Sequence, residues 1–143
     1  MINQDRLCDI MENRSAFARH MGIEMIEVTE DRLIMDLPVS EALANRNGVM
    51  HGGAILGLTD HAGGTATMIR LAEGTTTATV ESKVNFLRPI RIGDIARATV
   101  SAVHLGKTIQ VWDIAVTRAD GKLAARVTQT QMVMVWKEPG QAG

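Results

Sequence analysis

The sequence has few of the features on which disulfide-rich, nucleic-acid-binding and membrane proteins depend. Its single cysteine, Cys8, cannot form a disulfide within the chain, which fits a reducing compartment. The net charge is −1 and no basic stripe is present, so we expect no nucleic-acid partner. The apolar runs are far shorter than the roughly 20 residues of a membrane-spanning helix, so we expect no membrane partner. The first residues lack the basic start and long apolar run of a signal peptide, and we therefore expect a cytoplasmic protein.

Aromatic residues are also scarce, at 3%, whereas methionine occurs nine times. Methionine fills irregular gaps in cores and also lines adaptable apolar pockets, and the composition leaves both interpretations open. With 143 residues, 45% of them hydrophobic, the chain has the usual size and composition of one domain. We expect a single domain over residues 1–143, with a helical segment over about 1–21 and a frayed tail over about 137–143.

Apolar residues at helical spacing predict two helices. The first is a short amphipathic helix over about residues 5–20, ended by Gly22. The second is a longer helix from Gly52 or Gly53 to about residue 71, with a buried stripe formed by Ile55, Leu58, Ala62, Ala66 and Ile69. Glycines inside this helix weaken it by roughly 1 kcal/mol each. We therefore expect other elements to pack close to it.

Alternating patterns predict strands over residues 23–29, 32–38, 75–87, 95–104, 108–118 and 122–136. In the third of these, strict alternation places one set of residues on one face (Ala78, Val80, Ser82, Val84 and Phe86) and a second set on the other (Thr77, Thr79, Glu81, Lys83 and Asn85). The element order predicts an α+β fold, with an antiparallel sheet of five to six strands wrapped around the long helix. An exposed edge of such a sheet favours pairing with a second copy.

Residues 45–60 are the most informative part of the chain, because they place a loop, a glycine pair and an apolar helix in series. A helix N-terminus offers unpaired N–H groups and a partial positive charge. Glycine at positions 52 and 53 allows a substrate carbonyl to approach the backbone. Asp60 lies within the apolar stripe, where an acid is costly unless it is paired or functional. These are two parts that an acyl-transfer site needs.

The pattern Asn45-x-x-Gly48-x-x-His51-Gly52-Gly53, followed by Asp60, resembles the hotdog-fold acyl-CoA thioesterases, in the branch typified by the phenylacetate-degradation thioesterase. Two further segments, 84–94 and 104–108, resemble a strand with its turn and a hairpin of that family. The resemblance implies hydrolysis of an aryl-acetyl or medium-chain acyl-CoA to free acid and CoA. CoA is then part of the substrate, and no cofactor is required.

The resemblance also implies individual roles. Gly52 matches the residue whose backbone N–H polarises the thioester carbonyl, and Asp60 matches the nucleophile or general base. Asn45 and His51 match residues that shape the site beside the helix start, and Thr79 falls where some relatives have a serine that orients water. The residues expected to contact the substrate or its CoA portion are Gly53, Arg88, Gly106, Lys107 and Thr108.

The spacing of Gly52 and Asp60 predicts a composite site. The two residues are eight positions apart, which is about 12 Å along a helix axis, so one helix cannot bring both to one carbonyl. A second subunit with its helix running antiparallel could do so. We therefore expect an obligatory homodimer, and the family further implies a homotetramer built as a dimer of dimers.

Several alternatives remain open. His51 could be catalytic, although its place before the helix suits capping or bracing of the loop, and His61 is interpreted as a packing or surface residue. These histidines and Asp60 lack zinc-ligand spacing, so we expect no metal. A hydratase or dehydratase of the same fold, acting on acyl thioesters, and a non-catalytic acyl-CoA-binding protein are the competing functions, and neither would release CoA.

Overall fold

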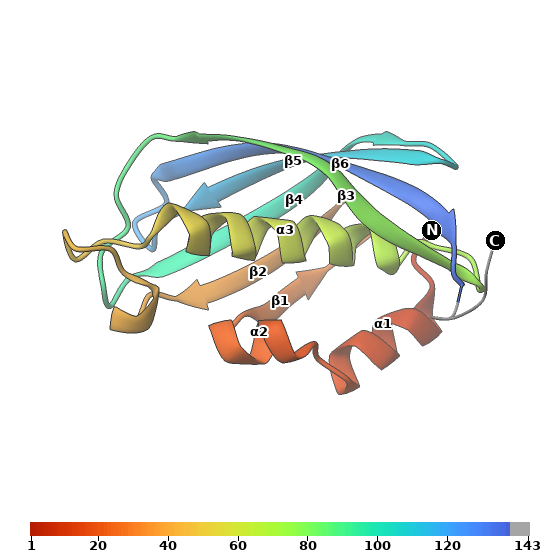
Figure 1. Cartoon of the computed structure of the whole chain (residues 1–143), viewed down its shortest axis with the longest axis horizontal. Coiled ribbons are helices and arrows are strands. Elements are labelled where there is room, and N and C mark those ends of the chain that lie inside the picture. Colours follow the sequence, from red (N-terminus) through yellow and green to blue (C-terminus); the bar gives the residue numbers. More distant parts are fainter. Residues whose placement is uncertain (138–143) are drawn as a thin grey trace.

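The computed structural model describes residues 1–137, which form one six-stranded antiparallel sheet with a long helix lying along it (Figure 1). The helices are α1 (Gln4–Glu12), α2 (Ala16–Met21), the 3-10 helix η1 (Glu41–Leu43) and α3 (Gly52–Met68). The strands are β1 (Glu24–Val28), β2 (Arg32–Pro38), β3 (Thr75–Phe86), β4 (Ile95–Leu105), β5 (Ile109–Thr117) and β6 (Leu123–Val135). This arrangement confirms the expected α+β fold. The frayed tail expected over about 137–143 lies, beyond residue 137, outside the described residues.

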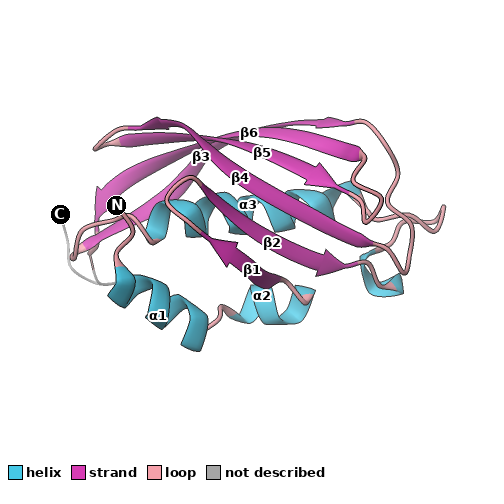
Figure 2. Cartoon of the chain, turned by 180° about the vertical axis from the view of Figure 1, so that it is seen from behind, coloured by secondary structure: helices cyan, strands magenta, loops and turns pink. Residues whose placement is uncertain are grey.

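The strand order is β1-β2-β4-β5-β6-β3, so β1 and β3 form the two edges of the sheet. The sheet curves around α3, and α1 and α2 lie beside the β1 edge (Figure 2). All five residues of the expected stripe on α3 are buried, and none is more than 4% exposed. They pack against inward residues of the sheet such as Leu37, Val100 and Ile114. Within residues 1–137, every helix is too short or too polar to span a bilayer.

The single N-terminal helix expected over residues 5–20 is wrong, because the segment forms two helices, α1 and α2. Asn13 ends α1, and the hydroxyl of Ser15 accepts a hydrogen bond from the backbone N–H of Ala18 and so begins α2. A serine at this position satisfies a free N–H group of a new helix better than it supports the interior of a longer one. The apolar spacing continues across the break, which is why periodicity alone did not detect it.

The strict alternation expected along β3 is also wrong. The register between β3 and β6 shifts between Thr79 and Glu81, so that Val80 is an extra residue, and it is 59% exposed. A bulge of this kind reverses the side on which the following residues lie. As a consequence, Thr79 before the bulge and Ser82 after it both face α3, although alternation assigned them to opposite faces.

Two glycines of α3 allow other elements to approach the helix closely, as the sequence predicted. A Cβ atom on Gly57 would lie 2.9 Å from the ring of Phe17 in α2. A Cβ atom on Gly63 would lie 1.8 Å from the side-chain oxygen of Gln129 in β6, which is completely buried. The contact at Gly63 therefore leaves no room for any larger residue.

We expect Gly63→Ala to destabilise the protein by about 1–3 kcal/mol, because the added methyl group overlaps a buried side chain that is held in place. The measurement is the free energy of unfolding in urea. Gly64→Ala is the matched control, because a Cβ atom there meets nothing within 4 Å. Removing a mid-helix glycine at that position should stabilise the fold by roughly 0.5–1 kcal/mol. Equal effects of the two substitutions would show that the contact with Gln129 is unimportant.

Candidate active site

The first turn of α3 contains a backbone N–H group that is free to bind a ligand. His51 is the N-cap, and its Nδ1 accepts a hydrogen bond from the N–H of Gly53 at 2.8 Å. The N–H groups of Ala54 and Ile55 donate to the His51 carbonyl. Among residues 1–137, no acceptor contacts the N–H of Gly52. A free N–H at a helix N-terminus stabilises negative charge.

The start of α3 opens into a pocket of about 350 Å³. Asn45, Gly52 and Arg88, three of the expected site residues, line this pocket together with Phe86. The side chain of Asn45 accepts a hydrogen bond from the backbone of its own loop, so it holds the loop beside the helix. The ring of Phe86 lies 3.1 Å from the position that a Cβ atom on Gly52 would occupy. The sequence signalled all of these residues except Phe86.

Asp60 lies about two turns further along α3 and faces β3. Its Oδ1 accepts hydrogen bonds from the Thr79 hydroxyl at 2.7 Å and from the Gln129 side-chain amide at 2.9 Å. No donor within residues 1–137 contacts Oδ2. The carboxylate is exposed in the single chain, which corrects the expectation that it lies within the apolar stripe. One oxygen is thus anchored, while the other remains available.

Two buried glutamines on β6, Gln129 and Gln131, extend the hydrogen-bond network around Asp60. Gln131 donates from Nε2 to the Thr79 hydroxyl at 2.8 Å and to the Gln129 side-chain oxygen at 2.9 Å. Gln129 donates from Nε2 to Asp60 and also to the Ser82 hydroxyl at 3.0 Å. Gln129 is 0% exposed and Gln131 is 1% exposed. A buried polar network in which each member is hydrogen-bonded is rigid, so it fixes the position of the carboxylate.

The alternation of residues along β6 indicates this network in the sequence. Ala125, Val127, Gln129 and Gln131 occupy alternate positions along β6 and therefore share one face. The first two are apolar and buried, so the two glutamines continue a buried face. Buried polar side chains need partners, and their position on an inward face indicates a site nearby.

The remaining candidates fall into two other places. Thr79 lies beside Asp60, and both line a second pocket of about 330 Å³. Gly106 and Lys107 line a third, of about 370 Å³, beyond the C-terminal end of α3 near Arg70. Thr108 follows them in the same turn. A single chain therefore separates the expected site into the start of α3, its middle and its far end.

The pocket near Lys107 contains one unsatisfied group. Gln110 is 7% exposed, and within residues 1–137 its side-chain oxygen has no hydrogen-bond donor. A buried acceptor of this kind costs stability unless water or a ligand supplies a donor.

Comparisons with known proteins show the family to which this chain belongs. The model of the thioesterase superfamily matches residues 47–125. A putative esterase of Haemophilus influenzae is 34% identical over 122 residues, which are 85% of this chain and 83% of that protein. The acyl-coenzyme A thioesterase PaaI of Escherichia coli is 29% identical over 115 residues, which are 80% of each chain.

Solved structures of related proteins have the same fold as this chain. A crystal structure of a thioesterase from Haemophilus influenzae has a TM-score of 0.82 and 29% identity, covering 99% of this chain and 95% of that one. The structure of the Escherichia coli PaaI protein has the same TM-score at 26% identity, covering 92% of this chain and 93% of that one. The chain therefore belongs to the thioesterase superfamily, has the PaaI-like hotdog fold, and is an enzyme that hydrolyses thioesters.

Proposed function

We propose that this thioesterase hydrolyses aryl-acetyl or medium-chain acyl-CoA to free acid and CoA, at a site shared by two chains of a homodimer. Gly52 of one chain polarises the thioester carbonyl, and Asp60 of the other is the general base or the nucleophile. One observation carries this proposal. The N–H at the start of α3 and the anchored carboxylate about two turns later lie in separate pockets of the single chain.

The chemistry follows from these two groups. Negative charge develops on the carbonyl oxygen during attack, and the Gly52 N–H stabilises it. Asp60 either takes a proton from the attacking water or attacks the carbonyl carbon itself, which gives a mixed anhydride that water then cleaves. In both routes the thiolate of CoA leaves. The hydrogen bonds at Oδ1 support Oδ2 as the reacting oxygen, because no donor within residues 1–137 contacts Oδ2.

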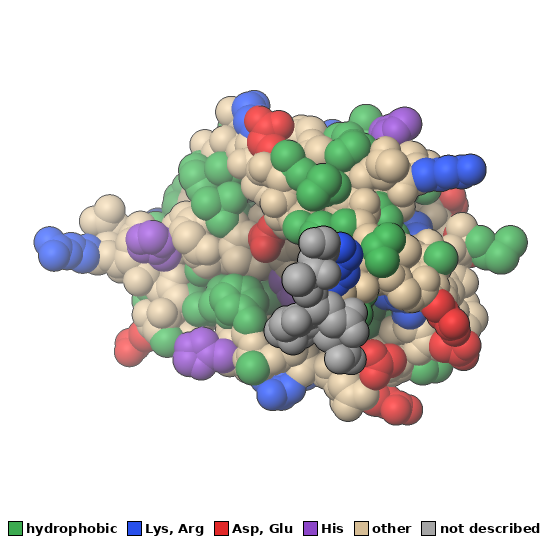
Figure 3. Space-filling model, turned by 45° about the vertical axis from the view of Figure 1, so that its right-hand side comes forward, with side chains coloured by type: hydrophobic (Ala, Val, Ile, Leu, Met, Phe, Trp, Pro, Cys, Tyr) green, Lys and Arg blue, Asp and Glu red, His purple; other side chains and the backbone are tan. Residues whose placement is uncertain are grey.

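The unpaired edge of the sheet supports the homodimer. β3 has 12 residues, and within residues 1–137 no strand pairs with its outer side. An edge of this length favours pairing with another strand. Val80, Phe86 and Leu87, on or next to this edge, are each more than half exposed. Figure 3 shows that hydrophobic side chains also form patches on the molecular surface. Pairing of β3 with β3 of a second copy would extend the sheet across a two-fold axis.

The same pairing would bring Gly52 of one chain close to Asp60 of the other. Along β3, Phe86 lies beside Gly52, and Thr79 lies beside Asp60. A two-fold axis between these points, near Ser82, would place the start of one α3 beside the middle of the other. It would also place Glu81 opposite the partner's Lys83, and both side chains are exposed in the single chain. Opposite charges directly across two strands are favourable.

The same symmetry suggests where CoA lies. An antiparallel partner helix would bring the partner's turn containing Gly106, Lys107 and Thr108 toward the side of Arg88. Cationic side chains suit the phosphates of CoA. The tetramer remains a prediction from the family resemblance.

The first test is a thiol-release assay on a panel of acyl-CoA substrates, with the wild type and Asp60→Asn. We expect a loss of at least ~100-fold in kcat, because the amide can neither take the proton nor attack. An asparagine oxygen still accepts from Thr79 and Gln129, so the fold should persist. Asp31→Asn, at an exposed position outside the site, is the control. Unchanged turnover in Asp60→Asn would reject its role, and a wild type without thiol release would reject the function.

The N–H of Gly52 can be removed on its own. Proline is well tolerated at the first position of a helix, and it prefers an extended residue before it. His51 has φ −65° and ψ 140°, which meets this condition. We expect Gly52→Pro to lower kcat by about 10²–10³-fold. Gly52→Ala is the control, because it keeps the N–H while adding a Cβ atom against Phe86. Equal losses in the two variants would show that the N–H is not used.

A mixture of the two inactive variants tests whether the site is shared. In a mixed dimer of Asp60→Asn and Gly52→Pro chains, one of the two sites combines the intact Gly52 with the intact Asp60. Random co-assembly should therefore restore about a quarter of the wild-type activity, since half of the dimers are mixed. The measurement is thiol release after the chains are refolded together. No recovery, with dimers present by gel filtration, would place both groups in one chain.

A further inference from the structure

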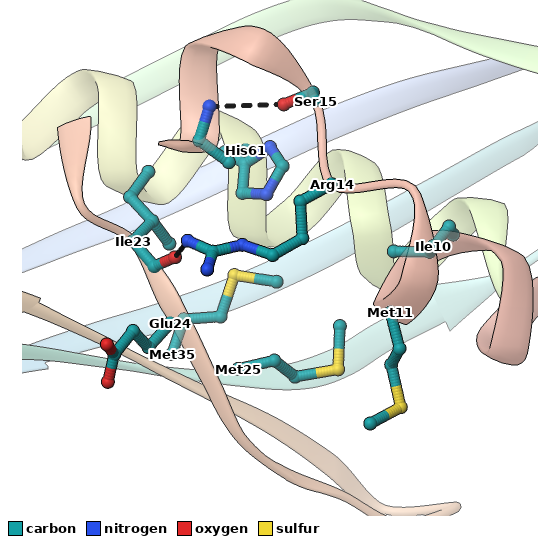
Figure 4. A pocket seen from close by; sticks show the side chains of 10 residues that line it. Ile10, Met11, Arg14, Ser15, Ile23, Glu24, Met25, Met35 and His61 are labelled. Carbon is teal, nitrogen blue, oxygen red and sulfur yellow. Dashed lines mark hydrogen bonds between the residues drawn. The ribbon is translucent and has the colours of Figure 1, made fainter. Parts of the chain in front are cut away.

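A further pocket, separate from the three described above, lies on the N-terminal side of the site, between α1, α2, β1 and α3 (Figure 4). Its volume is about 260 Å³. Six apolar residues line it, and three of these are methionines. The six are Ile10, Met11, Ala18, Ile23, Met25 and Met35. Met25 and Met35 are cross-strand neighbours on β1 and β2. This hollow is therefore built by five elements, α1, α2, β1, β2 and α3, and is mainly apolar. We refer to it as the methionine pocket.

The helices above the hollow are attached by both apolar and polar contacts. α1 has no buried residue. Its Arg6 donates to the carbonyls of Ala72 and Thr75 at 2.6 and 2.9 Å, and Arg14, in the loop after α1, donates to the carbonyl of Ile23. These hydrogen bonds hold both ends of α1, and its apolar residues Leu7 and Ile10 pack on the core while remaining only partly buried. An apolar space that the protein does not fill is unfavourable for water and suits an apolar ligand group.

The methionine pocket lies next to the cleft that contains Asp60. Ile10, Ser15 and His61 line both spaces. His61 directly follows Asp60 in α3, and Figure 4 shows its ring directed into the pocket, above Arg14. A group bound through its carbonyl at Asp60 therefore has an apolar space next to it, beneath α1 and α2.

The residue at the junction does not place a charge in this path at neutral pH. Burial lowers the pKa of His61 below its usual value, an effect that the negative charge of Asp60 partly opposes and that Arg14 reinforces. The guanidinium of Arg14 is directed to the carbonyl of Ile23 (Figure 4). An apolar chain can then pass without desolvating a histidinium.

We infer that the methionine pocket binds the acyl group of the substrate and sets which acyl groups the enzyme accepts. This inference rests on the proposed acyl-CoA hydrolysis. The volume is below that of a pocket for a complete drug-sized ligand, about 300–1,000 Å³, which fits a space for one part of a larger molecule. Methionine side chains are flexible, so the pocket accommodates both straight-chain and aryl groups.

The test compares two tryptophan substitutions at neighbouring positions of β1. Met25→Trp fills the pocket, whereas Ile26→Trp adds the same bulk at a residue that is 48% exposed and does not line the pocket. The measurement is kcat/KM for acetyl-CoA, octanoyl-CoA and phenylacetyl-CoA. We expect Met25→Trp to lower the values for the two larger substrates by ~10-fold or more relative to acetyl-CoA. Ile26→Trp should leave the ratios unchanged.

Met25→Ala keeps the test decisive if the larger residue destabilises the fold, because it should shift the preference toward longer acyl groups. If neither Met25 variant changes the ratios while the wild type hydrolyses acyl-CoA, the inference fails and the proposed function stands. If the wild type releases no thiol from any of the three substrates, the proposed function fails and the inference fails with it.

Discussion

The constraint on which the rest of the structure depends is the rigidity of α3. A helix fixes the separation of two residues by their sequence spacing, and for Gly52 and Asp60 that separation is about 12 Å along the axis. No side-chain rotation closes this distance to one carbonyl group. The helix therefore works as a spacer that presents two different groups to two different places. The free edge of β3 runs along the same helix, so the geometry that divides the reactive groups also provides the surface that would reunite them.

A single polar cluster accounts for two irregularities of the fold. Gln129 needs space beside α3, which explains why position 63 is glycine. The bulge at Val80 turns Thr79 and Ser82 to the same side, where both meet the glutamines of β6. Asp60 then receives its hydrogen bonds from two strands at once. Each feature alone weakens a helix or a strand. Both features meet at Gln129, which donates a hydrogen bond to Asp60.

Much of the fold could be predicted from the sequence because it depends on periodicity. The stripe on α3 and the strands followed from spacings of 3.6 and 2 residues. The failures were local events that periodicity does not record. The break at Asn13 and Ser15 depends on one hydroxyl group, and the reversal along β3 depends on one extra residue. The role of Gln129 depends on a contact 69 positions away in sequence, which no local pattern reveals.

The two sides of α3 differ in how tightly their side chains are held. On the β3 side, Asp60 accepts short hydrogen bonds from the Thr79 hydroxyl and from the buried side chain of Gln129, and these fix the position of its carboxylate. On the side of α1, the pocket is lined by flexible methionines and covered by a helix that buries none of its residues. Segments with few buried contacts open at the lowest free-energy cost. The structure therefore separates the groups proposed to react, which are held rigidly, from the wall facing the proposed acyl group, which can vary without moving Asp60.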